Sequence, residues 1–231
     1  MGRRRRGREH DCGESEQSHD ASIDSRAMTG ERDRPLREGD LDPDPVVQLR
    51  RWLDDARAAG VELPEAMTLA TSTRDGVPSA RMVLLKDADG AGLSFYSDYE
   101  SRKGRELADN PLAALVLYWH ELGRQVRAEG SVRPLSPEES DAYFGSRPLG
   151  SRLSAAVSRQ SEVVASREEL ERAAAELGRN RGDEVPRPER WGGYRLLPSS
   201  WEFWQHRVDR LHDRFRYRPA NGAWIIERLA P

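Results

Sequence analysis

The stretch MTLATSTRDGVPSARMVLLKDADGAGLSFYSD, residues 67–98, decides the fold class of this chain of 231 residues. It contains three segments of strand length, MTLATST, ARMVLLKD and GLSFYSD, in which apolar residues recur. Asp75-Gly76 and Asp89-Gly90 lie between the segments, and both dipeptides are strong signals for hairpin turns. The stretch therefore predicts three consecutive antiparallel strands.

Further strands are predicted towards the C-terminus, with an Asn-Gly turn before the last of them. Their sequences are LAALVLYW, RQVRAEGSVRPL, WGGYRLL, WEFWQ, RLHDRFRYR and AWIIERL. Signals for helix starts lie between the strands or before them, at Asp44-Pro45, Ser101, Ser136 and Ser166. Strands and helices do not alternate regularly. A mainly β fold, an antiparallel barrel with peripheral helices, is therefore favoured over a parallel sheet.

Composition separates a polar N-terminal tail from a folded domain. Residues 1–40 contain few apolar residues, so they bury too little surface to offset the entropy of ordering, and we expect them to be disordered. Residues 41–231 form the predicted domain. The whole chain is 36% hydrophobic and 33% charged, which fits a compact core diluted by polar segments.

Charge, cysteine content and hydropathy argue against several classes of protein. The formal net charge of −3 disfavours a general nucleic-acid binder. Cys12 is the one cysteine, so no disulfide can form within the chain, and a cytoplasmic location is expected. The five histidines have no cysteine partners at zinc spacing, so no metal site is predicted. No apolar run approaches the roughly 20 residues that span a membrane.

A row of polar side chains follows an aromatic cluster in WEFWQHRVDRLHDRFRY, residues 201–217. Arg210, His212 and Arg214 alternate, so on a β-strand all three would lie on one face. Two guanidinium groups and an imidazole suit a phosphate or a planar anionic ring. The alternative is an exposed edge strand whose charges prevent aggregation.

A second basic cluster begins a predicted helix. Arg102 and Lys103 follow the cap Ser101, in a first turn that normally favours acidic residues. They indicate a phosphate site, with chance surface charge as the alternative. Arg81 and Lys86 bracket the most apolar strand and have opposite parity, so without a bulge they would face opposite sides of the sheet. Such cations need an anionic partner or a route to solvent.

A second phosphate site is predicted where the helix after Ser136 ends. Tyr143 and Arg147 are four residues apart and share a helix face, Pro148 forces the chain out of the helix, and Ser151 follows. An ordinary surface helix is the alternative. No GxGxxG or GxxxxGK[ST] motif occurs, so a Rossmann or P-loop nucleotide site is not expected.

Eight motifs occur together and in order: RMVLLK (81–86), FYS (95–97), SRKGREL (101–107), RQV (124–126), YFGSRP (143–148), SRQS (158–161), EFWQ (202–205) and RLHDRF (210–215). The series resembles the pyridoxine/pyridoxamine 5′-phosphate oxidase family over about residues 44–231. The resemblance implies an FMN-binding split β-barrel that forms a homodimer, with FMN at the dimer interface. It also implies oxidation of pyridoxamine or pyridoxine 5′-phosphate by O2 to pyridoxal 5′-phosphate, with release of hydrogen peroxide.

The same resemblance implies roles for individual residues. Expected flavin contacts are Arg81, Met82, Val83, Leu84, Leu85, Lys86, Tyr96, Ser97, Arg102, Lys103, Gln125, Gln160, Ser161, Trp204 and Arg214. Expected substrate contacts are Lys86, Tyr143, Arg147, Ser151, Arg210, Leu211 and His212. Of these, Arg210 and His212 are the expected catalytic residues, which would position the pyridine ring and take part in proton transfer.

Two features depart from the family pattern. No arginine/tyrosine motif of the kind that folds over the substrate is found before Leu41, and HRVD (206–209) stands where a glycine-containing loop is usual.

Two alternative functions remain. A phenazine-pathway type of FMN oxidase would not need the phosphate-binding residues, and a non-catalytic carrier of flavin or pyridoxal phosphate would show no flavin reduction by substrate.

Overall fold

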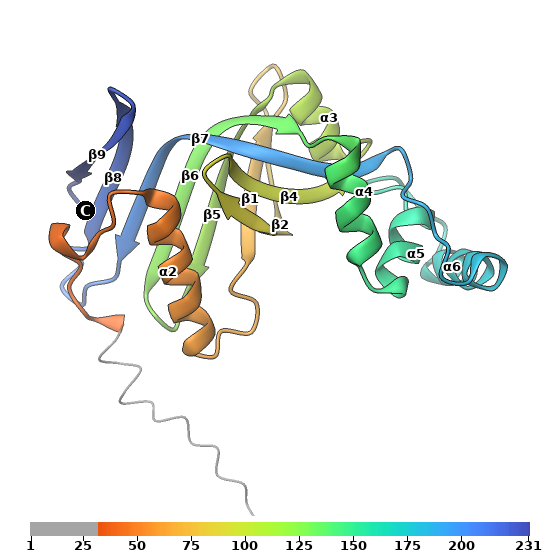
Figure 1. Cartoon of the computed structure of the whole chain (residues 1–231), viewed down its shortest axis with the longest axis horizontal. Helices are drawn as coiled ribbons and strands as arrows, with labels where there is room; N and C mark the ends of the chain where they lie inside the picture. The colour runs from red at the N-terminus through yellow and green to blue at the C-terminus, as the bar shows by residue number, and fades with distance from the viewer. Residues whose placement is uncertain (1–31) are drawn as a thin grey trace, which may run out of the picture.

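A curved antiparallel sheet of nine strands forms the body of the molecule, shown in Figure 1 as a computed structural model that describes residues 32–231. The strands are β1 (Ala66–Ser72), β2 (Pro78–Leu84), β3 (Asp87–Asp89), β4 (Gly92–Asp98), β5 (Leu112–Trp119), β6 (Arg124–Pro134), β7 (Trp191–Gln205), β8 (Asp213–Ala220) and β9 (Ala223–Arg228). Their order is β2-β1-β5-β6-β7-β4-β3, and β8 and β9 extend from β7. Because β2 and β3 end this order without pairing with each other, the barrel is open, which confirms the expected split barrel.

Helices surround the sheet without alternating with its strands. They are the 3-10 helix η1 (Glu38–Asp40) and the α-helices α2 (Pro45–Ala58), α3 (Arg102–Asp109), α4 (Pro137–Ser146), α5 (Leu149–Val157) and α6 (Arg167–Arg181). The predicted caps are present: Asp44, Ser101, Ser136 and Ser166 each accept a backbone N–H of the first turn. Helix α5 was not predicted. Pro148 ends α4, as expected, but it also stands at the N-cap of α5.

Strand β7 connects the two halves of the sheet. It is one strand of 15 residues, where the sequence predicted two shorter ones. Its first part pairs with β4 and its last part with β8, while β6 pairs along most of its length. The register of β6 and β7 shifts at Glu129/Gly130, opposite Pro198. A bulge tolerates a proline that a regular ladder would not, so the strand continues through the predicted break.

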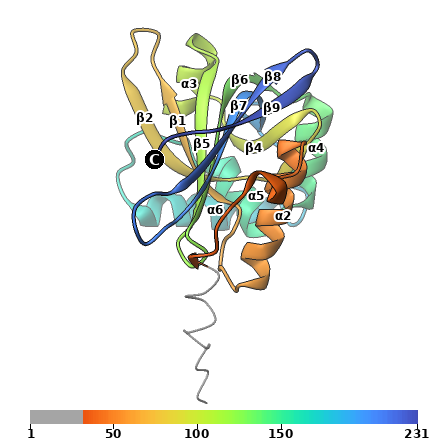
Figure 2. The same ribbon diagram turned by 90° about the vertical axis from the view of Figure 1, so that its left-hand side faces the viewer.

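The main core lies between α2 and the sheet. Trp52 of α2 packs edge-on against Trp119 of β5 and Phe203 of β7, with ring centroids 6.4 and 5.1 Å apart. A smaller cluster of Phe144, Val185 and Trp191 lies beneath α4 and α5. Figure 1 places α4, α5 and α6 at one end of the molecule and the β8–β9 hairpin at the other, and in Figure 2 that hairpin faces the viewer. The two clusters therefore support opposite ends of one sheet.

The described part of the predicted tail packs on the domain. The side chain of Leu36 is buried, and its N–H donates to Asp213 Oδ2 at 3.1 Å. Leu36 is an apolar residue within the predicted tail that the composition argument overlooked. Ordered structure thus begins before residue 41. The rest of the predicted tail, with Cys12, lies outside the described residues.

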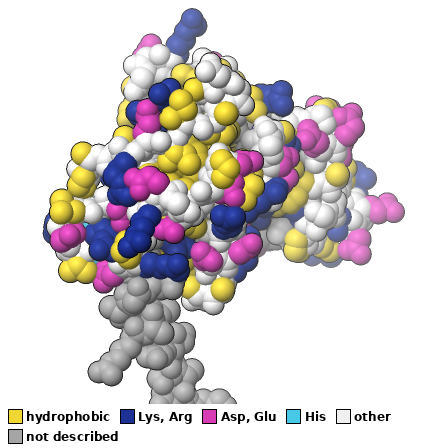
Figure 3. Space-filling view, turned by 60° about the vertical axis from the view of Figure 1, so that its left-hand side comes forward, with side chains coloured by type: hydrophobic (Ala, Val, Ile, Leu, Met, Phe, Trp, Pro, Cys, Tyr) yellow, Lys and Arg dark blue, Asp and Glu magenta, His cyan; other side chains and the backbone are white. Residues whose placement is uncertain are grey.

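The surface carries charges of both signs. Acidic and basic side chains are interspersed on the face shown in Figure 3, with no large area of a single sign. Within residues 32–231, no helix is long and apolar enough to cross a membrane.

Candidate active site

A cleft of about 420 Å³ opens between β2, β4 and the helices α4 and α5. Its volume lies in the range of small-molecule sites. The lining residues are Arg81, Met82, Val83, Leu84, Lys86, Tyr96, Ser97, Lys103, Tyr143, Arg147, Pro148, Ser151, Gln160 and Trp191. All of them except Pro148 and Trp191 were expected from the sequence as flavin or substrate contacts. Folding therefore brings segments far apart in the chain to one cleft.

One end of the cleft holds a buried ammonium group. Lys103, in the first turn of α3, is 9% exposed, and its Nζ donates to Ser97 Oγ at 2.9 Å, Ser101 Oγ at 3.1 Å and Gln160 Oε1 at 2.9 Å. All three acceptors are neutral oxygens. Burial, and then the nearby Arg81 guanidinium, lower the pKa of Lys103 to about 8. A cation that is held by neutral groups at a helix N-terminus is well suited to bind an anion.

The segment after α5 completes this end. Ser161 Oγ accepts the backbone N–H of Arg102 at 3.1 Å, and Ser97 Oγ donates to Gln160 Oε1 at 3.3 Å. Ser161 has a φ of 72°, in the left-handed region, which turns the chain back toward α3. The SRQS and SRKGREL motifs are thus neighbours in space. We call this part of the cleft, around Lys103, the Lys103 end.

The other end of the cleft holds the half-buried guanidinium group of Arg147. Arg147 Nη1 is buried and has no hydrogen-bond partner among the described residues. The guanidinium lies 4.6 Å from the centroid of the Trp191 ring, and burial lowers the pKa of Arg147. Because a buried unpaired donor is costly, this group is poised for an anionic ligand.

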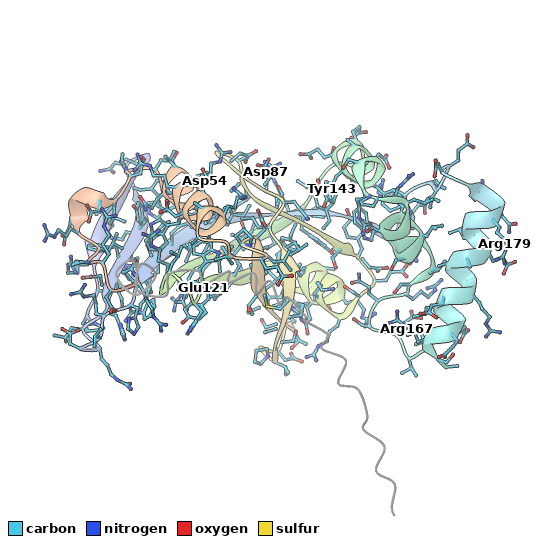
Figure 4. All side chains as sticks on the ribbon, turned by 90° about the horizontal axis from the view of Figure 1, so that it is seen from below. Asp54, Asp87, Glu121, Tyr143, Arg167 and Arg179 are labelled. Atoms are coloured by element: carbon cyan, nitrogen blue, oxygen red, sulfur yellow. The ribbon has the colours of Figure 1, made fainter. Side chains whose placement is uncertain are left out.

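Aromatic rings support the Arg147 end. Tyr143 of α4 stacks on Tyr96 of β4 with centroids 3.9 Å apart, and Tyr96 stacks on Trp191 at 5.5 Å. Lys86 Nζ lies 6.0 Å from the centroid of the Tyr143 ring. Tyr143 lies where the sheet meets the helical end of the molecule (Figure 4). Tyr143, Arg147 and Ser151 therefore converge as the sequence predicted.

The parity argument for Arg81 and Lys86 was wrong. Strand β2 ends at Leu84, so Lys86 lies beyond the strand and its direction does not follow the alternation. Both side chains line the same cleft. Leu85 does not line it: this residue is buried and borders a separate cavity of about 280 Å³ between α2 and β3.

A second group of expected residues does not line the cleft; it consists of Gln125, Trp204, Arg210, Leu211, His212 and Arg214. Gln125, Trp204 and Arg214 lie side by side across β6, β7 and β8. The remaining three lie in the loop between β7 and β8, at the end of the molecule opposite α4–α6 (Figure 1). We call these six residues the second group.

Arg210 and His212 do not lie on a strand, contrary to our expectation. Strand β8 begins only at Asp213, and the preceding residues form a turn in which Arg210 N–H donates to Arg207 O at 3.1 Å. Asp209 Oδ1 accepts the N–H of Leu211 at 3.0 Å, and Arg210 has a φ of 64°. An aspartate that bonds the backbone two residues on stabilises such a turn and ends the strand alternation.

The hydrogen bonds of His212 define its tautomer. Its Nδ1 accepts the backbone N–H of Arg207 at 3.0 Å, so the neutral ring carries its proton on Nε2. Burial, followed by the charges of His206 and Arg210, lowers the pKa of His212. The ring lies 4.7 Å from that of Trp204. His212 can therefore present an Nε2–H donor near neutral pH.

Arg214 already has a carboxylate partner. Its Nε and Nη2 donate to the two oxygens of Glu202 at 2.9 and 3.0 Å, and this pair raises the pKa of Arg214. Its Nη1 donates to the backbone carbonyl of Ala230 at 2.8 Å, so all three nitrogens of the guanidinium have partners within the chain. A bidentate pair of this kind holds the group in one orientation.

Sequence reasoning missed one residue that lines the cleft, Trp191, and one that lies behind it, Glu106. Trp191 lies beneath both Arg147 and Tyr96, but as the first residue of a strand it showed no pattern that would set it apart from a core residue. Glu106 bonds Arg102 Nε at 2.8 Å. Its position four residues after Arg102 is the standard helical spacing of an ion pair and could have revealed it.

Comparisons with known proteins agree with this geometry. A family model described as pyridoxamine 5′-phosphate oxidase matches residues 53–180, and one described as pyridoxine 5′-phosphate oxidase C-terminal dimerisation region matches residues 191–231. The chain is 56% identical over 200 residues to the pyridoxine/pyridoxamine 5′-phosphate oxidase of Thermosynechococcus vestitus, covering 87% of this chain and 95% of that protein. To the protein of the same name from Cupriavidus pinatubonensis it is 53% identical over 197 residues, covering 85% and 93%.

Solved structures share the fold. PhzG from Burkholderia lata 383, in complex with tetrahydrophenazine-1-carboxylic acid, superposes with a TM-score of 0.82 at 38% identity, covering 87% of this chain and 100% of that chain. A pyridoxamine 5′-phosphate oxidase-related, FMN-binding protein from Nostoc punctiforme gives 0.67 at 16% identity, covering 83% and 100%. The second likeness concerns the fold alone.

Proposed function

This chain belongs to the pyridoxamine 5′-phosphate oxidase family, and from that premise we propose that it is an FMN-dependent oxidase of vitamin B6 phosphates. The reaction would convert pyridoxine 5′-phosphate and O2 to pyridoxal 5′-phosphate and hydrogen peroxide. With pyridoxamine 5′-phosphate it would also consume water and release ammonia. The observation that carries the proposal is a single cleft lined by two cations without carboxylate partners in the described part of the chain, the buried Lys103 and the half-buried Arg147. Two anion-binding ends suit two phosphorylated molecules, the cofactor and the substrate.

The Lys103 end fits the phosphate of FMN. Lys103 is bonded to neutral oxygens, and Arg102 adds a second cation at the same helix N-terminus. Tyr96, Ser97 and the strand residues 82–84 would line the rest of the cofactor site. When bound, FMN supplies the two-electron redox chemistry that no side chain of the protein can perform.

The Arg147 end fits the phosphate of the substrate. Arg147 offers a buried donor, Tyr143 and Ser151 offer hydroxyl groups, and Lys86 adds positive charge. A phosphate is remote from the carbon that reacts. Its binding energy can therefore hold the substrate in the reactive geometry without taking part in the chemistry.

We infer that a homodimer completes each site. The second group carries the expected catalytic residues but does not line the cleft, and it lies mostly within the matched dimerisation region, residues 191–231. Large apolar side chains are exposed in both places: Met82 of β2 is 62% exposed and Leu211 is 66% exposed. Two copies that exchange these surfaces would bury both and join each cleft to the second group of its partner.

In such a site, the residues of the second group would orient the substrate ring. The Nε2–H of His212 can donate to the ring substituents, and the guanidinium of Arg210 can position the ring and stabilise negative charge on it. The proposed reaction requires no covalent nucleophile from the protein.

The phosphate-binding residues separate this proposal from the phenazine-type alternative. Lys86, Tyr143, Arg147 and Ser151 are all present and convergent, which a substrate without phosphate would not need. The matched B6-phosphate relatives also reach 56% identity, compared with 38% for PhzG.

The proposal is tested by supplying the FMN-loaded protein with pyridoxamine 5′-phosphate in air. We expect pyridoxal 5′-phosphate and hydrogen peroxide to form in equal amounts, and unphosphorylated pyridoxamine to react far more slowly. Bound flavin without any product would contradict the oxidase proposal and favour a carrier. Equal rates with and without the substrate phosphate would contradict the role of the Arg147 end.

A further inference from the structure

Glu106 is a buried carboxylate behind the Lys103 end of the cleft. It lies on α3, is 4% exposed, and is not one of the residues that line the cleft. Its Oε1 accepts Arg102 Nε at 2.8 Å, and its Oε2 accepts the hydroxyl groups of Thr71 and Ser79, each at 2.5 Å. A single carboxylate thus joins α3 to the neighbouring strands β1 and β2.

The ionised state of Glu106 is secure. Burial by itself raises the pKa of this carboxyl, but the hydrogen bonds from the two hydroxyl groups and from Arg102 outweigh it and hold the pKa at about 2. An ionised carboxylate can only accept hydrogen bonds. Both hydroxyl protons must therefore point to Glu106, and both hydroxyl oxygens remain free to accept other donors.

Arg81 uses those two oxygens. Its Nη1 donates to Thr71 Oγ1 at 2.6 Å, and its Nη2 donates to Ser79 Oγ. Nη2 also approaches Glu106 Oε2 at 3.4 Å. A further bond, from Nη1 to the backbone carbonyl of Leu69 at 3.1 Å, does not involve Glu106. The two hydroxyl contacts do, because the charge on Glu106 leaves both hydroxyl oxygens to accept from Arg81, so the orientation of the Arg81 guanidinium depends in part on that charge.

Unlike Arg81, Arg102 is held by Glu106 through a single side-chain nitrogen. Its Nε is bonded to Glu106, and among the described residues no hydrogen bond engages its two Nη groups. Those groups are free to form the paired donor that matches two phosphate oxygens. Glu106 therefore holds both arginines beside the Lys103 end.

We propose that Glu106 is a positioning residue that orients Arg81 and Arg102 for the 5′-phosphate of the flavin. The inference rests on the proposed function, since it assumes that a flavin phosphate occupies the Lys103 end. It predicts that Glu106 contributes to the binding of FMN and not to that of riboflavin, which lacks the phosphate. A merely structural role would affect the binding of both flavins.

The experiment is a fluorescence titration of flavin-stripped protein with FMN and with riboflavin. In Glu106→Gln, an amide N–H would face either Arg102 Nε or a hydroxyl proton, so at least one arginine loses its orientation. We expect the Kd for FMN to rise roughly tenfold, as for the loss of one hydrogen bond to a charged group, while the Kd for riboflavin stays unchanged.

The chain offers a matched control. Glu171 on the exposed helix α6 accepts Arg167 Nε at 2.6 Å with the same four-residue spacing (Figure 4 marks Arg167). Glu171→Gln removes an equivalent ion pair away from the cleft. We expect both flavin affinities to remain those of the wild type.

Three results would overturn the inference. An unchanged affinity for FMN in Glu106→Gln would do so, and so would an equal loss for FMN and riboflavin. Wild-type protein that binds neither flavin would overturn the proposed function and this inference with it. If Glu106→Gln fails to fold, Ser79→Ala removes one link to Arg81 and keeps the carboxylate. It should show the same phosphate-selective loss, and a loss shared by both flavins would again count against the proposal.

Discussion

Lys103 and Arg147 are the side chains on which the account of the cleft depends most. Lys103 is buried and Arg147 is half-buried with its Nη1 enclosed, and neither forms an ion pair with a carboxylate among the described residues. Burial lowers the pKa of both. A bound anion compensates for the hydration that such a group loses on burial. These two side chains are therefore suited to bind phosphate and not to stabilise the fold.

The lowered pKa of Lys103 predicts a pH dependence of FMN binding. Below its pKa of about 8, Lys103 is already charged and binding needs no proton. Above that value the phosphate must draw a proton onto Lys103, so FMN affinity should fall by up to about tenfold per pH unit. Titrations between pH 7 and 9.5 measure this effect. Lys103→Arg, which stays charged, should abolish the slope, and a flat wild-type profile would contradict the assignment.

Arg147→Met tests the substrate end of the cleft. Loss of a half-buried guanidinium that binds phosphate should raise the KM for pyridoxamine 5′-phosphate by roughly 30-fold or more, with FMN still bound. Steady-state kinetics with a flavin spectrum of the purified variant measure both properties. Arg167→Met on exposed α6 is the control. A wild-type KM in Arg147→Met would remove this residue from the substrate site.

At the scale of residues, the sequence predicted which residues line the cleft, but it did not predict their conformations or their contacts. The motifs contain almost every residue that lines the cleft, because functional side chains that lie a few residues apart can be recognised in a sequence. The turn at Arg210 was not visible, since a positive φ at a residue other than glycine is rare and depends on the side chain of Asp209. The orientation of Arg147 also depends on Trp191, which is 44 residues away in the chain and follows no local pattern.

At the scale of elements, the N-terminal segment of residues 32–36 supports the loop that carries Arg210 and His212. Asp33 Oδ1 lies 3.2 Å from His206 Nδ1, and Arg207 Nη1 donates to the backbone carbonyl of Asp33. Gln205 Nε2 donates to Arg32 O at 2.8 Å. His206 stands where the family usually has a more flexible loop. Compared with glycine, His206 restricts the backbone, but its side chain contacts this segment.

Asp33→Ala should therefore loosen the β7–β8 loop. We expect kcat/KM for pyridoxamine 5′-phosphate to fall by roughly threefold to tenfold, because one side-chain contact that restrains the loop is lost. FMN affinity should not change. Asp33→Glu should restore part of the activity. Glu121→Ala, in the exposed β5–β6 turn marked in Figure 4, is the control, and unchanged kinetics in Asp33→Ala would show that the contact has no functional role.

Local sequence patterns did not predict helix α5 or the continuity of strand β7. Turn and cap signals predicted most helices and hairpins, including the left-handed Asn221-Gly222 turn between β8 and β9. Helix α5 was missed because Pro148 signals a helix end as clearly as a helix start. The continuity of β7 was missed because Pro198 signals a break, whereas the strand continues through a bulge in which Ser199 of β7 has no partner in the register with β6.

At the scale of the whole molecule, the expected site residues are divided between two ends of one sheet. The family model that covers residues 53–180 contains all the lining residues of the cleft except Trp191, and the dimerisation region contains most of the second group. Strand β7 pairs with strands from the first region, so we treat residues 41–231 as one domain. An arrangement of this kind predicts that neither end is active without a second copy.

Mixed dimers test the shared site. Two differently tagged chains, one with Arg147→Met and one with Arg210→Ala, are co-expressed, and the dimers that carry both tags are purified. If each site joins a cleft to the partner's second group, one of the two sites is intact and activity should be about half that of the wild type. Each variant alone should be nearly inactive. Mixed dimers as inactive as their parents would indicate that each site forms within one chain.

The most direct test of the central claim is the visible spectrum of the FMN-loaded protein without oxygen, before and after addition of pyridoxamine 5′-phosphate. The account predicts that the flavin absorption band is bleached within the turnover time and returns when air is admitted, with pyridoxal 5′-phosphate formed in the amount of the flavin. A flavin band that persists in the presence of substrate would contradict the claim that this cleft oxidises a B6 phosphate.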